Sequence, residues 1–268
     1  SAGPMLNDRH VKAGVTRSIG AGTHTRMFWD EHQAGRINDA EWVQLEAKMT
    51  RSPGTCNTMG TASTMTALVE ALGLALPGST SIPAMDAAHV RMATGCGERI
   101  VQMVLADLTP ARLLTRGSFL NAAAVHMALG GSTNAVVHLI AMARRAGIEL
   151  ALDDLDDVGR RVPVLANLFP SGDRLMEDFY YAGGLPALMS RLTDRLSLDE
   201  LTVTGRTLRD NLASAEVLDP EVIRPLDRPV SASALAVLHG NLAPAGAVMK
   251  PSAADPRFLR HRGPALVF

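Results

Sequence analysis

The chain has 268 residues, of which 47% are hydrophobic and 20% charged, and its formal net charge is −1. This length can bury a substantial core, and the composition lacks the charge excess of a disordered chain. The near-neutral charge argues against nucleic acid or an anionic membrane as partner, because few phosphates would be neutralised. Aromatic residues make up only 4%, so we expect a core of closely packed helices rich in small side chains.

The sequence offers no membrane or export signal. The opening residues, SAGPMLNDRHVKAG, contain no apolar run, and the most apolar stretch, 135–143, is far shorter than the ~20 residues that cross a bilayer. Cys56 and Cys96 lie in different contexts. A disulfide between them is possible but unsupported. Because isolated cysteines are typical of reducing compartments, we expect a soluble enzyme of the cytoplasm.

Helical periodicity dominates the first half of the chain. Residues 3–25 lack periodicity and are expected to form an irregular arm. Asn38 is a predicted N-cap, Pro77-Gly78 a predicted helix end, and Thr109-Pro110 a predicted helix start. The helices expected in this half span 26–33, 39–49, 57–76 and 84–105.

The second half continues as helices and then changes character. Helices are expected at 118–129, 133–146, 153–161 and 185–196, and strands at 162–168, 234–238 and 265–268. Beyond Pro220 the chain is punctuated by prolines, which favours short β-type segments. We therefore expect a boundary between Asp210 and Arg228, with domains at 1–220 and 221–268. Because the sequence stops within an expected strand, we interpret it as an internal fragment of a longer protein.

Cys56 is the most informative residue for chemistry. It follows a turn and precedes the expected helix at 57–76, so the positive helix end favours a thiolate, the form that binds metal or acts as nucleophile. Gly54 and Gly60 permit close approach of a backbone or cofactor. A buried structural cysteine explains the same pattern equally well, because free cysteines are among the most buried residues.

The segment Gly130-Gly131-Ser132-Thr133-Asn134 is the second candidate. It breaks a helical pattern and supplies polar residues at the start of the next helix, an arrangement that can bind a carboxylate or phosphate. On physical grounds alone an ordinary helix–helix turn is the favoured interpretation.

Histidines and acidic residues add little to these two candidates. His126 and His138 lie in apolar helices and are expected to pack in the core, whereas His24 lies in a polar stretch and is a weak active-site candidate. The acidic residues at 153–157 are expected to cap a helix. The segment 177–184, aromatic and acidic before a Gly pair, fits either a substrate wall or a packed turn.

Six strings taken together identify a resemblance over nearly the whole chain. They are PGTCNTMGTASTM, IPAMDAAH, RIVQMVLADLTP, GGSTNAVVHLIAMARRAGI, LMEDFYYAGGLPALM and LHGNLAPAGAVMKPSA. In this order they resemble the dihydroxy-acid and phosphogluconate dehydratase family of iron–sulfur enzymes. The forms TCNTMGTASTM and LAPAGAVMKPSA are most similar to its sugar-acid branch, such as L-arabinonate dehydratase.

The resemblance implies a fold and a reaction. The fold is α/β: a helix-rich N-terminal domain with a small parallel sheet, followed by the start of a β-barrel-like C-terminal domain. The reaction is the dehydration of a 2,3-dihydroxy acid to a 2-keto acid. A [2Fe–2S] or [4Fe–4S] cluster and Mg²⁺ act as Lewis acids on the departing 3-hydroxyl, which suits a poor leaving group. The enzymes are homodimers or homotetramers, so a homo-oligomer is expected.

The resemblance also implies roles for individual residues. Cys56 matches one of three cluster-binding cysteines, and substrate contacts are expected from Thr55, Asn57, Ser132, Thr133 and Asn134. The other two cysteines are expected upstream of residue 1. The Mg²⁺ ligands are expected upstream of residue 1 or just beyond Phe268, and the base serine beyond Phe268. With one ligand of three, the fragment alone is expected to be inactive. The alternatives are dihydroxy-acid dehydratase of branched-chain amino-acid synthesis and a non-catalytic helical remnant.

Overall fold

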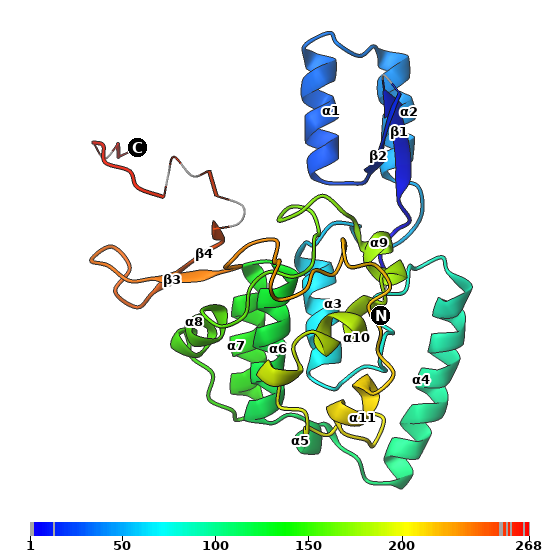
Figure 1. Cartoon of the computed structure of the whole chain (residues 1–268), viewed down its shortest axis with the longest axis vertical. Helices are drawn as coiled ribbons and strands as arrows, with labels where there is room; N and C mark the ends of the chain where they lie inside the picture. The colour runs from blue at the N-terminus through cyan, green and yellow to red at the C-terminus, as the bar shows by residue number, and fades with distance from the viewer. Residues whose placement is uncertain are drawn as a thin grey trace.

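The computed structural model describes residues 3–12, 14–251, 254–255, 257, 259–264 and 266–267. A helical body carries a smaller unit of two helices and a hairpin at one end, and the long helix α4 flanks the body on one side (Figure 1). No helix in the described part of the chain is long and apolar enough to cross a membrane.

The smaller unit corrects the expectation of an irregular arm at 3–25. Strands β1 (Asp8–Lys12) and β2 (Val15–Ile19) pair antiparallel. Gly14 has a φ of 77°, which suits a tight hairpin turn. Helices α1 (Thr23–Gln33) and α2 (Asp39–Met49) pack on this hairpin through a small apolar cluster.

Helix α2 has the bounds predicted from the sequence. The Asn38 side chain accepts the backbone N–H of Glu41 at 2.9 Å, and the Glu41 side chain accepts that of Asn38. This reciprocal capping box satisfies two N–H groups that the helix itself leaves unpaired.

The main core lies around α6 (Arg116–Leu129), which packs against α3 (Thr61–Ala71), α7 (Asn134–Arg145), α8 (Leu152–Gly159) and α10 (Gly184–Ser190). Nearly every residue of α6 from Ser118 onward is buried, including Ala122, Ala123 and Ala124. These small side chains let neighbouring helices approach closely, which confirms the expected small-residue core.

Helix α3 is shorter than the predicted helix at 57–76, because 57–60 form a loop before it and 72–76 lie outside the helix behind it. Helix α4 (Ala87–Leu105) follows after Asp86, whose carboxylate accepts the Ala88 N–H at 2.7 Å. Met103 is its one residue buried from solvent. Helix α5 (Pro110–Leu113) starts after Thr109 with proline in its first turn, as predicted.

The remaining elements are short. Helix α9 (Met176–Tyr181) precedes α10, and the helix predicted at 185–196 is divided between α10 and a 3₁₀ turn, η1 (Thr193–Arg195). Helix α11 (Leu208–Leu212) contacts α10. The strand predicted at 162–168 contains only isolated bridges, among them Val164 with Ser231.

The tail carries β3 (Ala236–Leu238) and β4 (Ala247–Met249), which pair antiparallel, and β3 lies against α8. Both two-stranded sheets of the described chain are antiparallel, and parallel pairing occurs as isolated bridges such as Pro4 with Thr55. The strand predicted at 265–268 includes residues 265 and 268, which lie outside the described residues. The fold is therefore helix-rich α/β with small antiparallel sheets.

Candidate functional site

The loop that carries Cys56 is pinned to the N-terminal segment. Thr55 donates its N–H to the Gly3 carbonyl at 2.9 Å and accepts the Met5 N–H at the same distance. A Cβ on Gly54 would lie 2.5 Å from the Met5 nitrogen, and Gly54 has a φ of 143°. Only glycine allows this approach, so the close-contact role predicted for Gly54 is confirmed.

The Cys56 thiol is free and half-buried. Its Sγ lies 3.1 Å from Thr58 Oγ1, and a Cβ on Gly22 would lie 3.9 Å from it. The Ser63 hydroxyl donates to the carbonyl oxygens of both Cys56 and Thr58, at 3.2 and 3.0 Å. The loop is therefore held by its backbone, while the sulfur faces a hydroxyl and a glycine that leaves space beside it.

Cys56 lies farther from the start of the helix than the sequence pattern predicted. Helix α3 begins at Thr61 with Gly60 as N-cap, so the loop residues 57–60 separate the thiol from the helix. The dipole acts mainly within the first turn, and its influence on this sulfur is accordingly weaker than the sequence pattern indicated.

Asn57, the residue after Cys56 in the loop, is fully buried. Its side-chain amide donates to Asn7 Oδ1 at 3.2 Å, and its carbonyl accepts the Met176 N–H at 2.8 Å. A Cβ on Gly20 would lie 2.2 Å from Asn57 Oδ1, an oxygen that lacks a hydrogen-bond partner in the described chain. These contacts link the Cys56 loop to the end of β2 and the start of α9.

The second predicted motif meets the first turn of α3. Ser132 Oγ lies 2.9 Å from Thr61 Oγ1, and the Asn134 amide donates to the same hydroxyl at 3.1 Å. The Ser132 N–H donates to Thr64 Oγ1 at 3.0 Å. Thr133 is the N-cap of α7 and forms no side-chain cap bond. The structure therefore brings 130–134 to the end of α3 that follows the Cys56 loop, a convergence that no sequence pattern predicted.

Two buried or partly buried side chains, His126 and Lys250, contact carbonyl groups of the 130–134 loop. The fully buried His126 places Nε2 2.9 Å from the Ser132 carbonyl, and burial lowers the pKa of His126 to about 4, so the ring is neutral. Lys250, from the segment after β4, donates to the Gly130 carbonyl, and burial lowers the pKa of its ammonium group. His126 is a core residue as predicted, whereas His138 is exposed on α7.

His24, which the sequence favoured only weakly, follows two residues after Gly22, the glycine beside the Cys56 sulfur. Its Nδ1 accepts the Gly20 N–H at 3.3 Å, and its ring lies 5.3 Å from that of Phe169. The Phe169 carbonyl accepts the Met59 N–H at 2.8 Å. Burial lowers the pKa of His24. No sequence pattern indicated that Phe169 belongs to this region.

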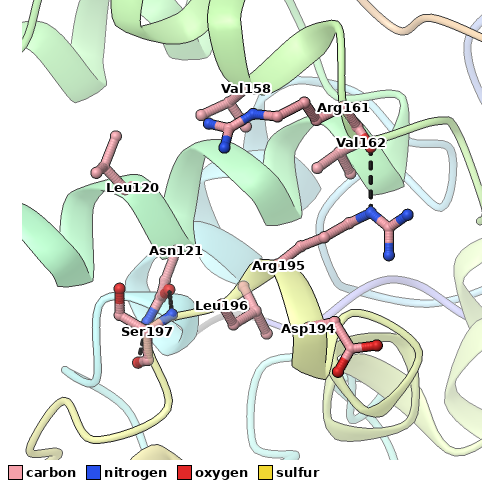
Figure 2. A pocket seen from close by; sticks show the side chains of 9 residues that line it. All are labelled: Leu120, Asn121, Val158, Arg161, Val162, Asp194, Arg195, Leu196 and Ser197. Carbon is pink, nitrogen blue, oxygen red and sulfur yellow. Dashed lines mark hydrogen bonds between the residues drawn. The ribbon is translucent and has the colours of Figure 1, made fainter.

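Another cavity, of about 810 Å³, lies away from these residues. Figure 2 shows that Asn121 exchanges two hydrogen bonds with the Ser197 backbone, at 2.9 and 2.7 Å, while Arg195 donates to the Arg161 carbonyl at 3.1 Å. None of the predicted site residues lines it. Its polar groups serve mainly to join α6 to the η1 turn.

The described residues contain no group of three or more His, Cys, Asp or Glu side chains that could hold a metal ion. Cys56 can therefore supply one ligand of a metal centre, through a free, half-buried thiol beside a glycine. A complete metal site requires ligands beyond those in the described part of the chain.

The comparisons with known proteins agree on one family. The model described as "Dihydroxy-acid/6-phosphogluconate dehydratase N-terminal" matches residues 1–211, and its C-terminal counterpart matches residues 221–268.

Relatives cover the whole chain. It is 54% identical to the 6-deoxy-6-sulfo-D-gluconate dehydratase of Pseudomonas putida, 49% to the L-arabinonate dehydratase of Rhizobium leguminosarum and 47% to the dihydroxy-acid dehydratase of Caldicellulosiruptor saccharolyticus. In each case all of this chain is aligned, with 46%, 46% and 48% of the relative. The chain thus spans about half the length of these proteins. It belongs to the dihydroxy-acid/6-phosphogluconate dehydratase family.

Proposed function

We propose that this chain is part of a hydro-lyase that converts a 2,3-dihydroxy sugar acid to the 2-keto-3-deoxy acid. The observation that carries the proposal is similarity along the entire chain to sugar-acid dehydratases, at 54% and 49% identity. A position beside Cys56 is the proposed place of reaction. The remaining active-site residues, including the base serine, are proposed to lie in the half of the relatives' length that this chain does not span.

Cys56 is the proposed ligand to one iron of a [2Fe–2S] or [4Fe–4S] cluster. Its free, half-buried thiol supports this assignment, and so does the absence of a side chain on Gly22, which leaves room beside the sulfur. When bound, the cluster and Mg²⁺ would supply Lewis-acid stabilisation of the departing hydroxide. The bonds from Ser63, Met5 and Gly3 hold the loop so that the thiol keeps its position.

Substrate contacts are proposed from Thr55 and from the loop residues Ser132, Thr133 and Asn134. The hydroxyls of Ser132 and Thr61, 2.9 Å apart, can donate and accept, which suits a polyhydroxylated substrate. Asn57 is completely buried, so its contribution is proposed to be the shape of the Cys56 loop.

The wider organisation is proposed on the same basis. The two matched segments support a division into domains at 1–220 and 221–268. In the whole protein we propose a small parallel sheet in the first domain, a β-barrel-like second domain, a cytoplasmic location and a homodimer or homotetramer. The alternatives are a dihydroxy-acid dehydratase of branched-chain amino-acid synthesis and a non-catalytic helical module.

Substrate turnover by the full-length protein distinguishes the sugar-acid dehydratase from these two alternatives. Aldonates and 2,3-dihydroxyisovalerate are supplied in parallel to anaerobically purified protein, and 2-keto acid is measured. We expect kcat/KM for the best aldonate to exceed that for the isovalerate by more than about tenfold, because hydroxyls that the site binds are absent from the smaller acid. The reverse preference favours the branched-chain enzyme, and no keto acid from either favours the non-catalytic module. The 268-residue chain alone is expected to be inactive.

A further inference from the structure

A cavity of about 650 Å³ lies between the β1–β2 hairpin and the loop before α9. From the hairpin, Arg9, Thr16 and Ser18 line it, and Arg9 pairs directly with Ser18 across the strands. Because residues two apart in a strand share a face, the hydroxyls of Thr16 and Ser18 lie on the same side. The volume is in the range of small-molecule sites. The full lining is Arg9, Thr16, Ser18, His24, Phe169, Gly172, Asp173 and Arg174.

The cavity is joined to the Cys56 loop by two of its walls. His24 is two residues beyond Gly22, the glycine that lies beside the Cys56 sulfur. Phe169 accepts the Met59 N–H on the other wall. The cavity therefore adjoins the segments that contact the Cys56 loop, where the reaction is proposed to take place.

His24 presents a hydrogen-bond donor there. Its Nδ1 accepts the Gly20 N–H, so the neutral ring carries its proton on Nε2. Burial lowers the pKa of His24, which keeps the ring neutral at physiological pH. Among the described residues no hydrogen bond engages Nε2, and the contact with Phe169 fixes the ring.

The rim of the cavity is cationic. The Arg9 guanidinium forms no ion pair within the described chain, and Arg174 Nε lies 3.4 Å from Asp173 Oδ1. Asp173 also accepts the Asn167 amide at 2.8 Å. Two arginines against one carboxylate leave a positive excess, and guanidinium groups bind sulfonate or phosphate oxygens through paired hydrogen bonds.

We propose that this cavity binds the far end of a linear sugar acid, with the His24 Nε2–H donating to a substrate hydroxyl and Arg9 and Arg174 binding a terminal tetrahedral anion. The inference rests on the proposed dehydratase function and narrows its substrate class to sugar acids with an anionic group at the end remote from the carboxylate.

Kinetics of the full-length protein test the arginines. The substrates are 6-phospho-D-gluconate, 6-deoxy-6-sulfo-D-gluconate and D-gluconate. In R9Q/R174Q, the ratio of kcat/KM for either anionic acid to that for D-gluconate should fall by about tenfold to a hundredfold, mainly through KM, because charge-assisted bonds are lost. The matched control is R161Q, which changes an exposed arginine of the other cavity and should leave the ratio unchanged. Preference for one anion over the other distinguishes sulfonate from phosphate.

Calorimetry separates this inference from the proposed function. We expect 6-phospho-D-gluconate to bind the full-length protein and R161Q alike and R9Q/R174Q at least about tenfold more weakly. Binding without turnover would keep the cavity assignment and reject the dehydratase. Three results would overturn the cavity assignment. The first is turnover by R9Q/R174Q with an unchanged preference for the anionic acids over D-gluconate. The others are equal binding of 6-phospho-D-gluconate by the wild type and R9Q/R174Q, and no binding of it by the wild type.

Two substitutions test His24. Glutamine can place an N–H near the position of Nε2, whereas asparagine cannot reach it. H24N should therefore lower kcat/KM for all three acids by about tenfold, and H24Q should recover part of that loss. Equal losses in H24N and H24Q would reject the donor role.

Discussion

The two cysteines of this protein lie in regions built in opposite ways. Cys56 is half-buried in a loop held by hydrogen bonds from the N-terminal segment, from Phe169 and from Met176. Cys96 is exposed on α4, and its thiol contacts Met92 of the same helix. A position fixed by several distant segments suits a ligand, because its geometry persists when the metal is absent. The α4 thiol has no such support.

The α4 region is also the less constrained in packing. Val90, Val104 and Leu105 on this helix are at least 70% exposed, whereas Phe119 and the alanines of α6 are buried. Substitutions near Cys56 should therefore be costly, and substitutions on α4 should be tolerated.

The largest expected effect concerns Glu70, which joins the two regions. Its buried carboxyl on α3 accepts the Gly78 and Thr80 N–H groups, in the segment that leads to α4. Burial raises the pKa of Glu70 from 4.5 to about 7. The Glu70 carboxyl therefore ionises at a lower pH in the unfolded chain than in the folded chain. As pH rises from about 4.5 to 7, this difference lowers the free energy of unfolding by ~3 kcal/mol in all.

His126 opposes this trend. Burial lowers the pKa of His126 from 6.5 to about 4. As pH falls, the imidazole therefore takes up its proton in the unfolded chain before it does so in the folded chain. The free energy of unfolding accordingly rises by ~3 kcal/mol as pH increases from about 4 to 6.5. The opposite contributions of Glu70 and His126 to the pH dependence of the unfolding free energy should nearly cancel in the wild type. Urea unfolding at several pH values should give a rising curve for E70Q and a falling curve for H126N. Curves parallel to the wild type would contradict both assignments.

A pair of glycine substitutions sharpens the comparison. A Cβ on Gly20 would overlap the Asn57 amide, so G20A should destabilise the chain by ~2 kcal/mol. Gly97 lies within α4 with nothing within 4 Å of an added Cβ, so G97A should stabilise it by ~1 kcal/mol. Urea midpoints measure both, and shifts of the same sign would contradict the difference between the regions.

The smallest effect concerns the start of α4. Replacing Asp86 by alanine removes the bond to the Ala88 N–H and should cost ~1 kcal/mol. Thr133→Ala is the matched control, because Thr133 is an N-cap without a side-chain cap bond, and its change in unfolding free energy should be close to zero. Equal losses would show that the Asp86 bond contributes nothing.

Local signals predicted much of the fold. The Asn38 cap fixed the start of α2, and the Gly130-Gly131 break separated α6 from α7. The hairpin at 8–19 was missed because Ala13-Gly14 is a weak turn signal between mostly polar strands. The late start of α3 was missed because the loop before it is held by Phe169 and Met176, more than a hundred residues away.

In the candidate site, too, local patterns predicted individual residues but not the contacts between distant segments. Cys56 and the residues 132–134 were recognisable from composition and from the family strings. The convergence of Ser132 and Asn134 on Thr61, the support from Lys250 and the cavity beside His24 depend on contacts across some 70 to 150 residues, which no local pattern encodes.

Iron content of the full-length protein tests the central claim most directly. C56S and C96S are purified anaerobically beside the wild type, and iron per subunit and visible cluster absorbance are measured. If Cys56 is the cluster ligand, C56S loses most of its iron and absorbance, while C96S matches the wild type and both variants remain folded by circular dichroism. Full cluster content in folded C56S would contradict the claim.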